Sequence, residues 1–153
     1  MASAANDRRV IQLEIDPGLV CLRGLSPTRL RFEVEYGLER GTTANSFLFL
    51  PSGGEPALLV HPPGNTFAEP YLEALASLVP SDARLQVVVG HTNPNRVQLL
   101  RQLAQHWPQL ELISSNPGAQ LLRELWDQRK PAPPGAAATE TPEALPPLPP
   151  LQV

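Results

Sequence analysis

The sequence predicts an α/β protein in which an antiparallel meander is followed by alternating strands and helices. The first observation is a series of short apolar runs, separated by proline and glycine turns, over residues 10–60. Such runs are typical of antiparallel hairpins. The second is a strand, helix, strand, helix order from Leu85 to Gln128, which predicts parallel strands joined by right-handed crossovers. The third is an abrupt change to proline and alanine after Lys130, where no packed element is expected.

The composition limits the classes of function. With 153 residues and 42% hydrophobic content, the chain is long enough for one packed domain. A net charge of −3 provides no basic surface, so nucleic acid and anionic membranes are not expected partners. Cys21 is the only cysteine, which excludes an internal disulfide, and no window approaches the ~20 apolar residues of a membrane span. Because the amino terminus also lacks a secretory signal, we expect a cytoplasmic protein.

The amino-terminal third predicts a hairpin and a half-buried strand. Residues 1–9 are small and polar, and we expect them to be disordered. Residues 10–15 and 19–23 flank the turn sequence Asp16-Pro17-Gly18 and therefore predict a hairpin. Residues 31–36 alternate between apolar and charged side chains, which predicts a single strand with one face in the core.

The next two strands are predicted at residues 46–50 and 57–60, paired around the turn at residues 51–54. Both runs are almost wholly apolar. We therefore expect residues 47–50 and 58–60 to lie at the centre of the sheet with both faces covered.

Three helices are predicted from apolar residues at helical spacing. Thr66 and Glu69 have the spacing of a capping box before the first helix, which ends before Pro80, and the second helix ends at Pro108. A third helix runs from Ala119 to about Gln128, after a strand at residues 110–114. The stripes of the first two helices, expected to face the sheet, are Leu72, Leu75, Ala76 and Val79, and then Val97, Leu100, Leu103, Ala104 and Trp107.

Residues 130–153 are predicted to form a disordered tail rich in proline and alanine, which leaves residues 10–129 as the folded part. Eight of the 23 residues after Lys130 are proline. Two other interpretations stay open. Residues 145–151 have the pattern of a proline-rich ligand for an aromatic groove, so the chain would be an adaptor. Alternatively, a frameshift or premature stop has replaced the rest of a longer domain.

The loop between Gly90 and Val97 is the expected functional site, because loops at the carboxyl ends of strands hold ligands in α/β proteins. Its polar residues are His91, Asn93, Asn95 and Arg96. One hypothesis is an anion or ion-pair site, since Arg96 and a helix amino terminus offer hydrogen-bond donors. The other is that Asn95 caps the helix and Arg96 is solvated. His61 ends another strand; it could supply a second nitrogen ligand but is expected to be a hydrogen-bonded loop residue.

Two segments resemble a known family. The loop at residues 91–96 resembles the metal-binding signature His-x-Glu-x-Asp-His in the metallo-β-lactamase-like domain of flavodiiron proteins. Residues 35–48 resemble the entry to that domain in the cyanobacterial diflavin members, and the resemblance covers residues 10–126. His91 matches the first ligand. The positions of the expected Glu, Asp and second His hold, in order, Asn93, Asn95 and Arg96.

The resemblance implies the first half of an αββα sandwich and a truncated, non-canonical family member in which His91 is a vestigial ligand. In the family, electrons pass from NAD(P)H through FMN to a di-iron centre that reduces oxygen to water. We expect this chain to bind none of these cofactors and to be inactive alone. It lacks the flavodoxin-like and flavin-reductase portions of a diflavin member, and two amides and a guanidinium do not neutralise a metal cation.

Half of a sandwich would expose an apolar sheet face of a few hundred Å². Self-association or a full-length flavodiiron subunit is therefore the expected partner. Alternative functions are a structural module that binds an anion and a metal-dependent hydrolase-like domain, whose His-x-His-x-Asp-His loop this chain matches only at His91.

Overall fold

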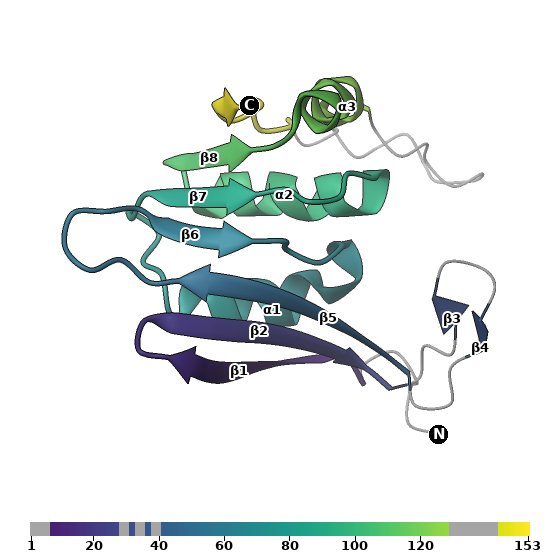
Figure 1. The fold of residues 1–153 in the computed structure, drawn as a ribbon. Coiled ribbons are helices and arrows are strands. Elements are labelled where there is room, and N and C mark those ends of the chain that lie inside the picture. The colour runs from purple at the N-terminus through teal and green to yellow at the C-terminus, as the bar shows by residue number, and fades with distance from the viewer. Residues whose placement is uncertain (1–6, 28–30, 33–35, 38–40, 129–143) are drawn as a thin grey trace.

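The computed structural model describes residues 7–27, 31–32, 36–37, 41–128 and 144–153, and their main feature is one mixed seven-stranded sheet (Figure 1). In spatial order its strands are β1 (Arg9–Asp16), β2 (Leu19–Ser26), β5 (Thr42–Phe49), β6 (Ala57–Val60), β7 (Leu85–Val88), β8 (Leu110–Ile113) and β9 (Leu151–Gln152). The helices are η1 (Asn65–Phe67), α1 (Ala68–Ala76), α2 (Pro94–His106) and α3 (Asn116–Trp126). None of the helices in these ranges is long and apolar enough to cross a membrane.

The predicted meander and the crossover layer are both confirmed. Neighbours from β1 to β6 pair antiparallel, and β6, β7 and β8 pair parallel. The turn between β1 and β2 contains Gly18 at φ +80°, a left-handed conformation that glycine adopts without steric cost. Because β6, β7 and β8 run parallel, their carboxyl ends meet at one edge of the sheet.

The prediction of one strand over residues 31–36 is wrong. Two short strands, β3 (Arg31–Phe32) and β4 (Tyr36–Gly37), pair antiparallel with each other outside the main sheet. Phe32 and Tyr36 are register partners in this pair, so the two short strands run in opposite directions. Period-two alternation fits both arms of a short hairpin as well as one strand, and the pattern alone did not distinguish the two.

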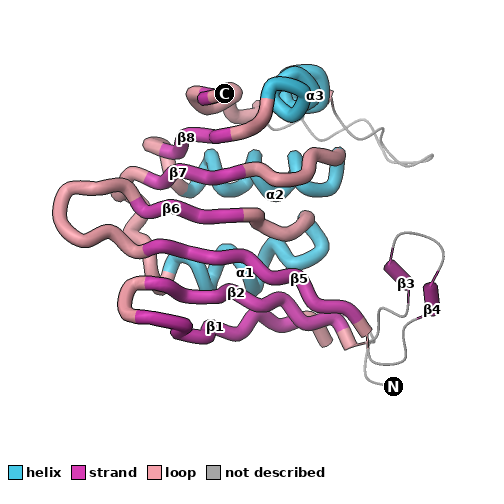
Figure 2. Tube along the Cα trace, viewed as in Figure 1, coloured by secondary structure: helices cyan, strands magenta, loops and turns pink. Residues whose placement is uncertain are grey.

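Helices α1 and α2 lie on one face of the sheet, and the opposite face carries no described helix (Figure 2). Their buried side chains meet one set of strand residues, which includes Leu22, Leu48, Leu59 and Leu112. The predicted capping box is wrong, because α1 begins after the short helix η1 with no side-chain cap. Pro70 lies in the first turn of α1, where its missing N–H costs no helical hydrogen bond.

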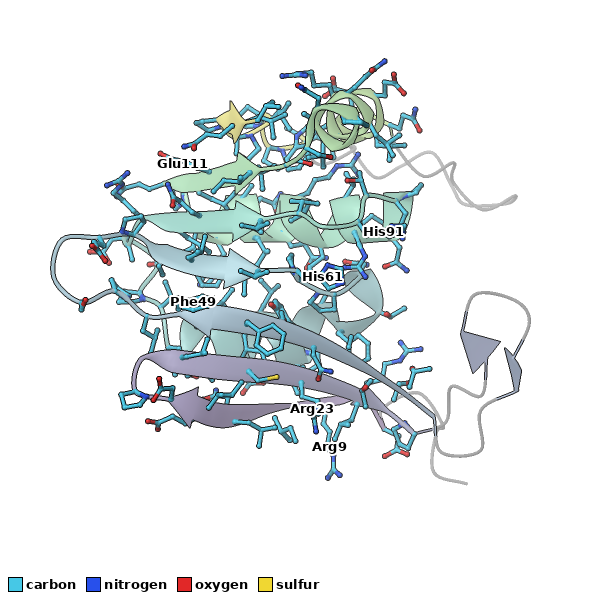
Figure 3. All side chains as sticks on the ribbon, in the orientation of Figure 1. Arg9, Arg23, Phe49, His61, His91 and Glu111 are labelled. Carbon is cyan, nitrogen blue, oxygen red and sulfur yellow. The ribbon has the colours of Figure 1, made fainter. Side chains whose placement is uncertain are left out.

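The face opposite the helices, called the open face below, is largely apolar. One row crosses the sheet in register through Leu13, Cys21, Phe47, Val60, Val88 and Ile113. Phe47 is 38% exposed and Phe49 is 44% exposed, and Phe49 projects from β5 away from the helices (Figure 3). The expectation that residues 47–50 are covered on both faces is therefore wrong. Their sequence is that of a two-sided central strand, but the described residues cover only the helix side.

The last ten residues differ from the expected disordered tail. Residues 144–153 run along β8 and end in β9, which pairs parallel with β8 through Leu151 and Gln152. The rest of the predicted tail, residues 129–143, lies outside the described residues, as do residues 1–6 of the predicted disordered amino terminus.

Candidate functional site

The carboxyl ends of β6 and β7 bring two histidines to one edge of the sheet. Val60 and Val88 are partners in the parallel pairing, and His61 and His91 follow these strands. Figure 3 shows the two histidines at this edge, beside the start of α2. The N–H of His61 donates to the carbonyl of Val88 at 2.9 Å. His61 also has φ +62°, the left-handed region that side chains other than glycine rarely adopt.

The first turn of α2 is capped by Asn93. Its side-chain oxygen accepts a hydrogen bond from the Arg96 N–H at 2.8 Å, and its backbone is extended. The expectation that Asn95 is the cap is therefore wrong by two positions. Pro94 explains the difference, because proline favours the first helical position and the residue before it is then the cap.

Asn95 and Arg96 instead hold the loop that follows β6. The Asn95 side-chain oxygen accepts from the N–H of Asn65, and the Arg96 guanidinium donates to the Pro62 carbonyl at 2.6 Å. A Cβ at Gly64 would lie 2.5 Å from the Asn95 side-chain oxygen, so a larger residue there would displace the Asn95 amide. Arg96 is partly buried and bonded, in contrast to the solvated guanidinium expected by the capping hypothesis. These bonds join segments that lie 30 and 34 positions apart in the sequence.

The electrostatics of this edge disfavour added positive charge. Partial burial, and then the neighbouring Arg96 and His91, lower the pKa of His61 below its ordinary value of 6.5. The Arg96 guanidinium, which is always charged, would repel a metal cation and attract an anion. The anion hypothesis is consistent with this charge pattern and stays a prediction.

The lowered pKa of His61 predicts a loss of stability in mild acid. The unfolded chain takes up a proton on His61 near pH 6.5, whereas the folded chain resists it, so stability is full above that pH and falls below it. In His61→Asn, the thermal midpoint should fall less than the wild-type midpoint between about pH 7.5 and 5.5. Asparagine lacks the titrating group and tolerates a positive φ. Equal pH dependence of the two chains, followed by circular dichroism, would contradict the assignment.

No family model matches the sequence. The chain is 44% identical over 121 residues to "Putative diflavin flavoprotein A 6" of Nostoc sp. (strain PCC 7120), covering 79% of this chain. It also superposes with a TM-score of 0.72 on a metal-soaked Flv1 flavodiiron core from Synechocystis sp. PCC6803, at 32% identity. The chain is homologous to one portion of the diflavin flavodiiron proteins.

The match to this family covers only part of each relative. The chain spans about a fifth of the length of the curated diflavin relatives, 21% for the Nostoc protein. The structural match to the Synechocystis flavodiiron core covers 95% of this chain but only 32% of that core. A crystal structure of residues 1–254 of diflavin flavoprotein A 5 from Nostoc sp. PCC 7120 has a TM-score of 0.70 and 38% identity, and the match covers 79% of this chain and 47% of that fragment. The predicted metallo-β-lactamase-like fold is thereby confirmed.

The loop residues of this flavodiiron chain do not fit the family's iron ions. Asn93 and Asn95 use their side-chain oxygens for backbone N–H groups, and Arg96 is a cation with no lone pair to donate. Within the described ranges no group of three or more His, Cys, Asp and Glu side chains is placed to hold a metal. Of the residues at the family's ligand positions, His91 alone has a side chain that binds iron.

Sequence reasoning assigned His61 a minor role and missed Pro62, Gly64 and Asn65 altogether. The structure brings His61 beside His91 and Arg96, and it makes the other three the partners of the loop. The residues Pro62-Pro63-Gly64 could have signalled a loop with a close backbone approach, because glycine after a proline pair often marks such a place.

Proposed function

We propose that this chain is a non-canonical flavodiiron domain portion in which the iron loop now serves to hold the scaffold. The supporting observation is that the side chain at each of the three substituted ligand positions makes a hydrogen bond within the fold. The amide of Asn93 caps α2, the amide of Asn95 binds Asn65, and the Arg96 guanidinium binds the Pro62 carbonyl. Side chains committed to such bonds give the folded chain stability but offer no charge to a cation.

The family activity belongs, in this proposal, to the complete protein. NAD(P)H-driven reduction of oxygen through FMN and a di-iron centre would require portions that the matched region of the relatives does not include. This chain would contribute a folded portion of the metallo-β-lactamase-like domain and be inactive alone, as a partner of a full-length, canonical subunit. The free, buried Cys21 and the net charge of −3 support a cytoplasmic setting.

The open face is the proposed contact with that partner. In the Nostoc fragment of residues 1–254, about half of the chain lies outside the 47% match and would supply material to cover the sheet. The open face leaves Phe47 and Phe49 partly exposed, and contiguous exposed apolar surface often marks an interaction site. We expect the chain, when purified by itself, to cover this face with a second copy.

Ferrous iron is expected to leave the thermal midpoint of the purified chain unchanged under anaerobic conditions. A ligand at 100 times its Kd would add about 2.7 kcal/mol to the free energy of unfolding, so binding would be visible. The matched comparison is Asn93→Glu/Asn95→Asp/Arg96→His, which restores the family signature. This variant should melt at a lower temperature, because losing the cap costs about 1 kcal/mol, but iron should raise its midpoint.

A rise in the wild-type midpoint would contradict the proposal if His91→Ala abolishes that rise. It would mean that His91 still anchors iron with ligands outside the loop. Magnesium at the same concentration controls for the effect of ionic strength on the melt.

A further inference from the structure

The final segment of the chain, residues 144–153, completes the edge of the sheet. The N–H of Leu112 donates to the Pro150 carbonyl at 2.8 Å, and the N–H of Ser114 donates to the Gln152 carbonyl at 3.0 Å. The Gln152 side chain also donates to Glu111 at 3.2 Å. These bonds occupy donors on an edge strand that would otherwise be open to pairing.

An aromatic groove between α2, α3 and β8 receives the proline-rich part of this segment. The indole N–H of Trp126 donates to the Pro146 carbonyl at 2.8 Å, and Leu148 and Leu151 pack against the core. The body side of the groove is formed by Ala104, Trp107, Pro108 and Leu110. A cavity of about 280 Å³ remains between these residues and the five residues from Pro146 to Pro150.

Contacts within the body fix the wall of the groove. Arg101 of α2 donates to the carbonyls of Leu125 and Gln128 at 2.8 and 2.7 Å, and also to the carbonyl of Trp126. Its guanidinium lies 6.0 Å from the centre of the Trp126 ring. The carboxyl end of α3 is therefore held by α2, so the Trp126 donor is positioned without help from the segment that it binds.

We propose that this groove is a binding site for a proline-rich peptide that continues as a parallel strand on β8, and that residues 144–153 are its ligand within the same chain. An indole that donates to a proline carbonyl is the chemistry of proline-rich recognition, and the edge of β8 adds main-chain pairing. The segment lies at an edge of the sheet with a cavity beside its prolines, and both features favour local opening over that of the close-packed core.

The test uses the full chain with Leu148→Asp/Leu151→Asp, which removes the two apolar anchors of the segment and leaves the body unchanged. Amide hydrogen exchange of Leu112 and Ser114, followed by NMR, should become at least about tenfold faster than in the wild type. The Val89 N–H, which donates to Ile113 within the body, should stay protected. A synthetic peptide of residues 144–153 should then restore protection and give a saturable change in fluorescence, since both tryptophans of the chain lie at the groove.

Trp126→Phe in the full chain is the second variant, because it keeps an aromatic ring and removes only the indole donor. Exchange at Leu112 and Ser114 should rise about fivefold in this variant. If Val89 loses protection in Leu148→Asp/Leu151→Asp, that variant has unfolded, and the Trp126→Phe result then tests the proposal. The proposal is overturned if exchange at Leu112 and Ser114 does not change in a variant that remains folded. It is equally overturned if the peptide at about 1 mM fails to restore protection, or if a peptide carrying both aspartates restores it as well.

Discussion

Replacing Phe47 and Phe49 together with lysine is expected to convert the self-associated chain into a monomer. Phe47 and Phe49 lie at the centre of the open face and are 38% and 44% exposed. In a dimer the two ammonium groups would be buried against an apolar row without partners, which costs several kcal/mol, and two aromatic contacts would be lost. We expect association to weaken at least about 100-fold, which corresponds to about 3 kcal/mol. Size-exclusion chromatography with light scattering over a concentration series measures the change.

The matched control for this experiment is Leu121→Lys. The exposed fraction of Leu121, 37%, is similar to that of Phe47, but Leu121 lies on α3 and not on the sheet. The lysine stem can lie along the apolar surface, so all three substitutions should preserve a cooperative melt. A wild-type chain that is monomeric at every concentration would contradict self-association, and equal weakening by Leu121→Lys would place the contact elsewhere.

The parts of the fold that depend on local sequence signals, such as turns and consecutive strands and helices, were predictable from sequence. The hairpin of β1 and β2 follows from the turn at Gly18, and the parallel order of β7 and β8 follows from the helix between them. The pairing of β9 with β8 was not predictable in the same way. Leu151 lies among prolines, which argue against a strand, and its pairing depends on an edge 39 positions earlier in the chain, at Leu112.

For the candidate site, too, local features were predictable and contacts between residues distant in sequence were not. The loop after β7 and its four polar residues were found from the strand, loop and helix order, and the cap of α2 was misplaced only by two positions. Which side chains the loop binds was not accessible, because Asn95 and Arg96 meet residues 30 and 34 positions earlier in the sequence. The sequence also predicted an apolar face in need of cover, but it did not show that Phe47 and Phe49 lie on that face.

Trp107→Ala is expected to cause the largest loss of stability of any single substitution considered. The Trp107 side chain is fully buried, and its indole N–H donates to the carbonyls of Pro80 and Val79 at 3.0 and 3.3 Å. Truncation would leave a large cavity and remove this donor, at a cost of about 3–5 kcal/mol out of a total of about 5–15. Urea denaturation reports the change, with Trp126 as the remaining fluorophore.

Trp107→Phe separates the two contributions, since it keeps most of the packing and removes only the N–H; about 1–2 kcal/mol should be lost. A cost below about 1 kcal/mol for Trp107→Ala would contradict the role of this residue as the anchor of α2. The consequence reaches the candidate site, because α2 presents Asn95 and Arg96 at one end and is held by Trp107 at the other. If Trp107 fixes the helix as a rigid element, Trp107→Ala should also reduce the burial of His61 and, to a smaller extent, the effect of Arg96 on it. The pH dependence of the remaining stability should then become shallower.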